Sequence, residues 1–477
     1  IITRQPDADG GAVLGFEGGD DDYYRGRAYL GGSFGQDGRY SLALGRSDSG
    51  DVVEDSEREL DFLTGSLVYD FSEDSSLSAG LRYSDSERSN YPEDSGGPEF
   101  AVWDELDQGE SEDLSLHLSW QSKATQLWQY QLTADWFNIE SEESSPGIFP
   151  GFEIPPTGAD VEFDRYSLSW VNRLQLDALR LGVGMDFERE EGDSQGYIDY
   201  GFPLDASFEL ERDTYGGFAE LHYDVSKALA LSGSVRYDDV DESDSEVTSR
   251  LGLLWRLANG ATQLRANWGE GFKPPSFFAL AHPLVGNPDL QSETSSSWDV
   301  GIEHRFNDGV SLNLVYFDTT YRDLVDFDDE TFRNVNRDRV ETNGVEFSFT
   351  ATLGGYGDLR GHATYADSNV ANSDVELRGR PDWKAGLQWF YSVKSNIGLA
   401  AEYLWVDEVI EASQHTGQSL DYTLDAYNTL DISLNWQVSD SIKLKATVSN
   451  VLDENYEQAV GFPAAGIFPR LGVEWRP

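Results

Sequence analysis

The sequence predicts an all-β fold: a transmembrane, antiparallel, up-and-down β-barrel of about 22 strands, with long extracellular loops and short periplasmic turns. Two patterns support this prediction. Apolar and polar residues alternate with a period of two from end to end of the chain, and short and long connections alternate between those segments. Helical periodicity does not reach a convincing length anywhere.

The alternation is clear in residues 229–238, 430–436 and 442–449. In the last segment Ile442, Leu444, Ala446 and Val448 occupy one face, and polar residues occupy the positions between them. An outward apolar row on so many strands exceeds what a soluble sheet would expose. A propeller, the main soluble alternative beside a run of β-sandwiches, should repeat a motif at about 40–50 residues, and no such repeat is found.

The connections set the number and direction of the strands. Short polar turns are expected at residues 36–39, 72–76, 122–126, 175–179, 225–228, 258–261, 307–309 and 438–441. Long connections are expected at residues 90–108, 142–160, 193–205, 273–291 and 412–423. About 22 strands leave roughly 22 residues for each strand with its connection, which is enough because a spanning strand needs about 9–11.

The composition fits this fold and excludes several functions. The 477 residues include 13 Trp, 23 Tyr, 25 Phe and 47 Gly, a mixture that suits strands and turns. The formal net charge of -53 argues against nucleic-acid binding, which needs Lys and Arg for phosphate contacts. The absence of Cys excludes disulfides and thiol catalysis. The six His are scattered without metal spacing and no nucleophile motif is found, so we expect no enzyme.

Residues 268–277 (WGEGFKPPSF), followed by 286–290 (GNPDL) and Glu293, resemble the barrel of TonB-dependent outer-membrane receptors. In that family a strand end of this type leads into a long extracellular loop and then into a "GNP" return. The residues that match are Gly271, Pro275, Gly286, Asn287, Pro288 and Glu293. Gln291 and Ser292 replace the usual Lys-Pro of the return.

Three further segments are similar to the same family. They are residues 336–346 with Gly344 and Glu346, residues 379–381 with Pro381, and residues 448–456 with Asn450 and Tyr456. The residues of these motifs most resemble those of cobalamin-receptor-like members of the family. The resemblance implies a monomer in the outer membrane of a Gram-negative bacterium, surrounded by lipid and lipopolysaccharide. It also implies TonB-dependent uptake of a scarce small molecule such as cobalamin, a siderophore or another metal chelate.

The first four residues, Ile1 to Arg4, resemble the end of the plug domain that fills the barrel in this family. By that resemblance residues 1–9 are a remnant of the plug-to-barrel junction, and residues 10–477 are a barrel that lacks its plug. The family's plug supplies part of the ligand site and carries the segment that TonB pulls. Two alternatives remain: a passive porin-like pore without a plug, natural or engineered, and a receptor whose plug is a separate chain.

Aromatic residues on the long connections are the candidate ligand-binding residues, because rings capture ligands by stacking and apolar contact. The alternative is that they anchor the loops at the membrane interface or pack among themselves. The candidates are Phe149, Phe152, Tyr197, Tyr200, Phe202, Phe277, Phe278 and His282.

Acidic residues crowd the connection from Asn90 to Asp113. Calcium takes about six to eight oxygen ligands, so Glu93, Asp94, Asp104 and Asp107 are candidate calcium ligands. The rival interpretation is a solvated loop whose like charges repel one another. No other cofactor is expected.

Overall fold

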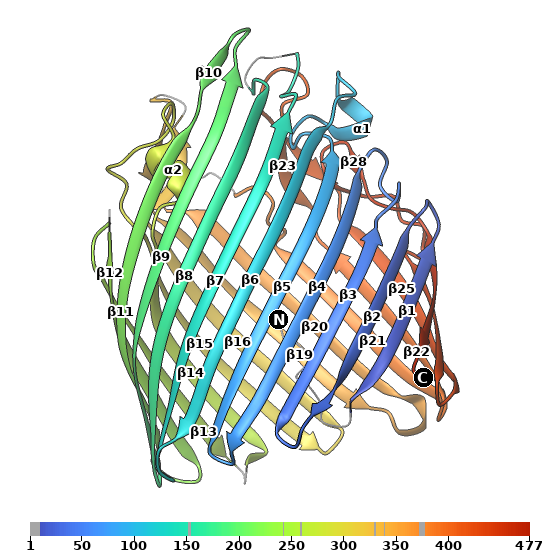
Figure 1. Ribbon diagram of the computed structural model, residues 1–477. Coiled ribbons are helices and arrows are strands. Elements are labelled where there is room, and N and C mark those ends of the chain that lie inside the picture. Colours follow the sequence, from blue (N-terminus) through green and yellow to red (C-terminus); the bar gives the residue numbers. More distant parts are fainter. Residues whose placement is uncertain are drawn as a thin grey trace.

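The computed structural model describes residues 10–150, 154–241, 243–257, 260–328, 331–337, 339–371 and 377–477. Within these ranges, 22 strands form one closed antiparallel barrel (Figure 1), as the alternation predicts. Each strand pairs with its neighbours along the chain, and the first strand closes the ring on the last through pairs such as Leu14 with Trp475. Residues 1–9, the predicted junction, lie outside the described residues.

The barrel strands differ widely in length. The first eleven, in chain order, are β1 (Gly11–Gly19), β2 (Tyr24–Phe34), β3 (Gly38–Asp48), β4 (Glu57–Ser72), β5 (Ser75–Asn90), β6 (Asp107–Lys123), β7 (Trp128–Ser145), β8 (Thr157–Leu176), β9 (Leu179–Asp199), β11 (Phe208–Asp224) and β12 (Leu229–Val240). The remainder are β13 (Glu246–Leu257), β14 (Thr262–Lys273), β15 (Glu293–Asn307), β16 (Val310–Arg322), β19 (Val340–Thr352), β20 (Asp358–Val370), β21 (Trp383–Lys394), β22 (Ile397–Val406), β25 (Tyr427–Ser439), β26 (Ile442–Ser449) and β29 (Phe468–Trp475). Strands β4 to β9 have 16 to 21 residues, so they form a tall wall at the front of Figure 1.

One rim of the barrel carries the tight turns. Each predicted short turn whose residues are all described joins two consecutive barrel strands; residues 175–179, for example, span the end of β8 and the start of β9. Residues 258–259 of the predicted turn at 258–261 lie outside the described residues. Two tight connections were not predicted from the sequence, namely the 3-10 turn η2 (Gly354–Tyr356) and residues 395–396. We call this end the tight-turn rim and the opposite end the long-loop rim.

The long-loop rim holds short helices and hairpins of its own. They are α1 (Gly97–Phe100), β10 (Pro203–Asp205), α2 (Phe277–Ala281), β17 (Leu324–Asp328), β18 (Arg333–Arg337), β23 (Val409–Ser413), β24 (Leu420–Leu424), β27 (Glu457–Ala459) and β28 (Phe462–Pro463). Residues 193–205 were expected to be a loop, but β9 continues to Asp199 and the chain then folds back into β10. The reversal is tight because Gly201 takes a positive φ of 89° between the two strands.

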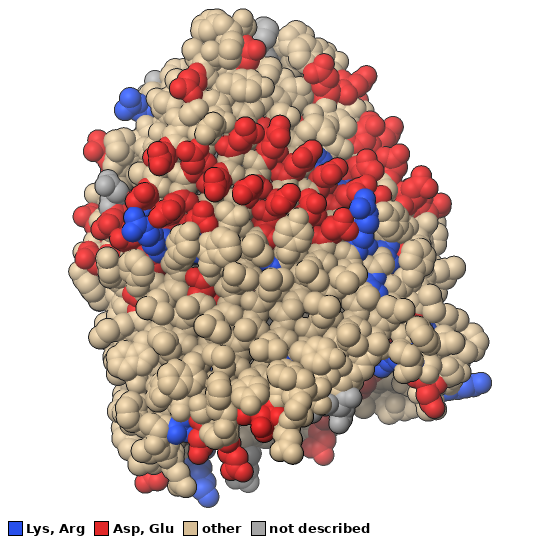
Figure 2. Space-filling view, in the orientation of Figure 1, with Lys and Arg blue, Asp and Glu red and all other residues tan. Residues whose placement is uncertain are grey.

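The outer surface carries an apolar belt beneath an acidic band. On β6, Leu116, Leu118 and Trp120 are 40–48% exposed, because they point away from the barrel in the outward row. Figure 2 shows few charges in this belt and a dense band of Asp and Glu directly above it, toward the long-loop rim. None of the helices in the described ranges is long and apolar enough to cross a membrane.

The only apolar core among the described residues lies in the loops at the long-loop rim, not between strands. Ala279, Leu280 and Leu290 are buried there, and Leu210 and Val325 pack against them. A barrel wall has no second layer to bury its residues, so the ordered loops supply the packing that positions side chains at the mouth.

Candidate functional site

A cavity of about 1010 Å³ lies inside the barrel mouth at the long-loop rim. Its wall comes from the upper ends of β5 to β9 and from β11, and its other side comes from α2 and the β17–β18 hairpin. The rings that line it are Phe163, Tyr197, Phe208, Phe277, Phe278, His282 and Phe327. We call it the outer cavity. Its size and aromatic lining are those of a small-molecule site.

The segment 274–292, which we call the α2 loop, folds as a compact unit. The Ser276 side chain accepts a hydrogen bond from Ala279 N at 3.1 Å and so caps the short helix. Gly286 N then donates to His282 O at 2.8 Å. This return needs glycine, because a Cβ on Gly286 would overlap His282 O.

The β17–β18 hairpin holds the α2 loop in place. Asn287 donates through Nδ2 to Asn334 O at 2.9 Å, and Asn336 donates to Gln291 O at 3.0 Å. Glu293 accepts from Val325 N at 2.8 Å. Side-chain amides therefore join two loops that have no regular strand pairing with each other, and the Glu293 carboxylate at the start of β15 also holds the hairpin.

Arg212 fastens the α2 loop to the inner wall. Its guanidinium donates to Glu190 at 2.9 Å and to Pro275 O at 2.9 Å, and it lies 4.8 Å from the centroid of the Phe277 ring. Glu190 is only 6% exposed and also accepts from Arg165 at 2.8 Å. These charge-assisted contacts direct the loop into the barrel mouth instead of outward.

A glycine on the wall makes room for the Phe277 ring. A Cβ on Gly192 of β9 would lie 2.6 Å from Phe277 Cδ2. The Phe277 ring also lies 6.1 Å from the Phe163 ring, and the Phe278 ring lies 6.3 Å from the Phe208 ring. Each phenylalanine of α2 is thus matched by a phenylalanine on the wall.

His282 is a neutral part of the lining. Its Nδ1 accepts hydrogen bonds from the backbone N–H groups of Leu284 and Val285, both at 3.3 Å. The tautomer that fits these bonds carries its proton on Nε2. The ring is 6% exposed, and this burial lowers the pKa of His282.

The structure brings together four of the eight aromatic candidates. Tyr197, Phe277, Phe278 and His282 line the outer cavity. Phe149 instead stacks on Trp103 at 4.8 Å. Tyr200 and Phe202 lie at the exposed tip between β9 and β10, outside the cavity lining, and Phe152 lies outside the described residues.

The sequence analysis missed Phe163, Phe208 and Arg212, although two of them carry a signal. On β8 the apolar outward row includes Leu168 and Trp170, so Phe163 stands in the inward row. An inward row is expected to be polar, and an inward phenylalanine near the long-loop rim is therefore informative. The same reasoning applies to Phe208 on β11. Arg212 had no comparable signal, because arginine is ordinary at inward positions.

Among the described residues, the four candidate calcium ligands do not bring their carboxylate oxygens together as one group. Glu93 and Asp107 line the outer cavity, and one oxygen of Asp107, Oδ1, is buried without a hydrogen-bond partner. Asp94 has a raised pKa because of burial and the nearby charge of Glu93. Among the described residues, the acidic side chains with mutually close oxygens are Asp48, Glu57 and Glu59 on the outer surface. Calcium binding by the predicted set stays a prediction.

The remaining motif residues have structural roles. Asn450, which is 4% exposed, donates through Nδ2 to Glu454 O and Ala465 O and takes a positive φ of 46°. Tyr456 stacks on Tyr427 at 4.0 Å. A Cβ on Gly344 would overlap Tyr365 O of the neighbouring strand. Gly271 and Glu346 lie in β14 and β19, and Pro288 and Pro381 lie in the connections before β15 and β21.

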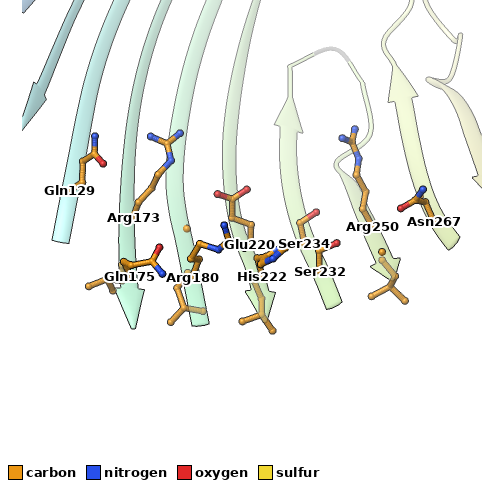
Figure 3. Close-up of a pocket in the computed structure, with 18 of the residues that line it drawn as sticks. Gln129, Arg173, Gln175, Arg180, Glu220, His222, Ser232, Ser234, Arg250 and Asn267 are labelled. Carbon is orange, nitrogen blue, oxygen red and sulfur yellow. The ribbon is translucent and has the colours of Figure 1, made fainter. Parts of the chain in front are cut away.

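A second cavity, of about 740 Å³, lies against the inner wall near the tight-turn rim. We call it the inner cavity. Figure 3 shows its polar side chains along the ends of neighbouring strands. Its charged residues are Lys123, Arg173, Arg180, Glu220, Arg250 and Asp299, together with His222. Basic residues therefore outnumber acidic ones here, whereas carboxylates dominate the outer cavity.

Known proteins resemble this chain in sequence and in fold. The vitamin B12 transporter BtuB of Vibrio cholerae serotype O1 is 26% identical over 486 residues, which cover 98% of this chain and 74% of the relative. The ferripyoverdine receptor of the outer membrane of Pseudomonas aeruginosa superposes with a TM-score of 0.84 at 15% identity, covering 100% of this chain and 73% of that one. The ferric-catecholate import receptor Fiu of E. coli gives a TM-score of 0.83 at 14% identity, with 100% and 83% covered.

The family model described as "TonB dependent receptor-like, beta-barrel" matches residues 5–451. That range includes the strands from β1 to β26, the α2 loop and the motif residues that hold it. The relatives are transporters and receptors, which agrees with the expectation that the chain is not an enzyme. The chain belongs to the TonB-dependent receptor family, as a member of its β-barrel part.

Proposed function

We propose that the protein is a Gram-negative outer-membrane receptor that captures a scarce small molecule in the outer cavity for TonB-dependent uptake. The observation that carries this proposal is the aromatic cavity itself, about 1010 Å³ in volume and built by a loop that is fastened into the barrel mouth. A passive pore has no need for such a loop. The apolar belt supports a setting in lipid and, on the acidic side, lipopolysaccharide.

Cobalamin and metal chelates are the candidate ligands. The relative in sequence named above is a vitamin B12 transporter, and the neighbours in fold include receptors for ferripyoverdine and ferric catecholates. The proposal includes a plug domain, either in the same polypeptide or in a separate chain, because TonB acts through the plug in the family that the motifs resemble. The inner cavity is a polar surface that such a domain would contact.

Uptake by cells tests the proposal. Cells that lack their own receptors and make this chain should accumulate radiolabelled cyanocobalamin, a ferric hydroxamate or a ferric catecholate, and lose this uptake when TonB is deleted. Replacing both Phe277 and Phe278 by Ala should weaken binding of the accepted ligand about tenfold, because two rings that line the cavity are removed. Tyr200→Ala is the matched control, since Tyr200 is 52% exposed on a hairpin tip. Unchanged binding by the double variant would contradict the proposal.

The second candidate function is a passive porin-like channel, favoured by the polar inner wall. Planar-bilayer recordings separate the two. A receptor with its plug should show no steady conductance, whereas a pore should show a large and constant one. Light scattering of the detergent complex would test the expected monomer in the same preparation.

A further inference from the structure

The lining of the outer cavity combines two unlike kinds of side chain. One part is aromatic and includes Phe163, Phe277 and Phe278. Another part is acidic and includes Asp107 at the start of β6 and Glu143 near the end of β7. A ligand in the cavity would therefore meet both π faces and carboxylates.

The negative charge of the cavity is poorly compensated. Its carboxylates are Glu93, Asp107 and Glu143, together with Glu162 and Asp193, which stand in the outward rows of β8 and β9 and also line an outward groove. Arg88 is the one arginine or lysine among the described residues that line the cavity. Arg88 is already paired with Glu143 at 2.6 Å. His282 adds no positive charge at neutral pH, because its Nδ1 accepts two backbone hydrogen bonds.

Two further observations point to unmet negative charge. The buried Oδ1 of Asp107 has no hydrogen-bond partner among the described residues. Beside the cavity, on the β23 hairpin, Glu411 has a raised pKa because of burial and the charges of Asp94 and Glu93. Carboxylates that suppress one another's ionisation in this way are stabilised when a cation arrives.

The aromatic part of the lining already contacts positively charged groups of the protein. The Arg212 guanidinium lies 4.8 Å from the Phe277 ring centroid, and that of Arg165 lies 5.4 Å from the Phe163 centroid. The electron-rich faces of these rings favour positive charge. The aromatic and acidic parts of the lining therefore favour the same kind of group.

We propose that the outer cavity selects ligands that carry positive charge on or beside a flat apolar body, and that it discriminates against anionic chelates. The inference rests on the proposed function only in taking this cavity as the ligand site. It narrows the candidate ligands to cationic chelates and to neutral ligands with a cationic centre. Tris-catecholate complexes of iron, which are strongly anionic, are rejected.

Three water-soluble probes of similar size and shape test the charge preference. They are methyl viologen, an aromatic dication; 4,4′-bipyridine, which is neutral; and biphenyl-4,4′-disulfonate, a dianion. Calorimetric titration of the detergent-solubilised full chain, corrected with empty micelles, should show methyl viologen binding at least about tenfold more tightly than the disulfonate. The affinity for bipyridine should lie between these two. Equal or tighter binding of the disulfonate would overturn the proposal.

The chain is so acidic that its overall field also attracts cations, so a matched pair of variants is needed. Asp107→Asn with Glu143→Gln removes two carboxylates from the cavity lining. Glu112→Gln with Glu140→Gln removes two from the outward groove on the same two strands. The cavity variant, Asp107→Asn with Glu143→Gln, should reduce the ratio of methyl viologen affinity to disulfonate affinity about threefold or more. The outward variant, Glu112→Gln with Glu140→Gln, should leave this ratio within about twofold of the parent value.

Equal effects of the two pairs would assign the preference to the overall field and overturn the proposal. A third variant locates the binding without altering charge: Phe278→Leu should weaken methyl viologen and bipyridine alike, because this ring is 51% exposed at the cavity. No effect of Phe278→Leu would place the probes elsewhere and also overturn the proposal. Circular dichroism confirms that each variant keeps its strands.

These titrations use purified protein and no transport step. Absence of TonB-dependent uptake together with a cation preference in the cavity would reject the proposed function but keep the charge selectivity. Uptake of an anionic chelate that depends on Phe277 and Phe278 would support the proposed function but reject the charge selectivity. The two conclusions can therefore fail separately.

Discussion

The outer and inner cavities occupy the same barrel but are built in different ways. The outer cavity depends on the α2 loop, which Arg212, Asn287 and Ser276 hold in place. The inner cavity is lined by strand and turn residues from β6 to β15, such as Arg173 and Arg250. The shape of the outer cavity therefore depends on loop contacts, whereas the shape of the inner cavity follows from the inward-pointing side chains of the strands.

The two cavities also differ in charge. Carboxylates prevail around Asp107 and Glu143 at the mouth, and arginines prevail around Arg173, Arg180 and Arg250 near the tight-turn rim. The cavities therefore favour groups of opposite charge along one lumen. Substitutions at the mouth should accordingly change the local stability of the α2 loop strongly, and substitutions at the inner wall should change it little.

The largest effect is expected from Arg212→Leu. The change removes two contacts to the α2 loop and leaves Glu190, 6% exposed, with Arg165 as its remaining partner. We expect a loss of about 2 kcal/mol in the local stability of the loop, less than for a fully unpaired buried charge. Hydrogen exchange over residues 274–292 measures this loss.

Arg250→Leu is the matched control for this prediction, because Arg250 lines the inner cavity. It should leave exchange in the α2 loop unchanged. Comparable loosening of the loop by both substitutions would contradict the separation between the two cavities.

The barrel could be predicted from the sequence because strand alternation is a local pattern. The outward row of Leu116, Leu118 and Trp120 can be recognised within β6 alone, without knowing which strands lie beside it. The tight turns could be predicted from the sequence for the same reason, except at η2 and residues 395–396. The length of β9 was underestimated, because a polar strand that rises above the apolar belt has the composition of a loop.

The site was only partly predictable because its contacts join distant segments. Phe149 and Phe277 look alike in the sequence, since both stand in long aromatic connections. Phe277 enters the cavity because Gly192 leaves space for it and Arg212 binds the adjacent carbonyl. Phe149 has Trp103 as its stacking partner instead. No local pattern shows which loop will find such partners.

A smaller effect should follow from Gly286→Ala. The new methyl group would overlap the His282 carbonyl, so the loop return must open, at a cost of about 1 kcal/mol in local stability. Gly355→Ala at the tight-turn rim is the control, because a Cβ there meets nothing within 4 Å. Limited proteolysis should cut the first variant faster than the parent within the α2 loop, and the second at the parent rate. Equal rates for all three proteins would show that the return is not tightly packed.

Acid should loosen the same loop through His282. Its pKa in the folded protein is lowered from the ordinary 6.5 by burial, so the folded loop binds fewer protons than the unfolded one. Loop stability is therefore complete above the ordinary pKa and declines as the pH falls below it, because a proton on Nδ1 would face the backbone N–H groups of Leu284 and Val285. Hydrogen exchange of the loop should accelerate, after correction for intrinsic rates, between about pH 7.5 and pH 5. His282→Asn should remove this dependence, and its persistence in that variant would point to another group.

The smallest effect concerns calcium at the long-loop rim. Glu93 and Asp107 line the outer cavity, whereas Asp94 and Asp104 do not, so the four predicted residues do not form one compact ligand set among the described residues. Burial and the charge of Glu93 also raise the pKa of Asp94. On the outer surface Glu59 is already paired with Arg46, which weakens the group formed with Asp48 and Glu57. Solvation of these carboxylates then accounts for the acidity, and calorimetric titration with about 1 mM calcium should release no more heat than sodium chloride of equal ionic strength. A saturable calcium signal that Asp94→Asn with Asp104→Asn abolishes, and that Glu112→Gln with Glu140→Gln preserves, would instead establish the predicted loop as a calcium site.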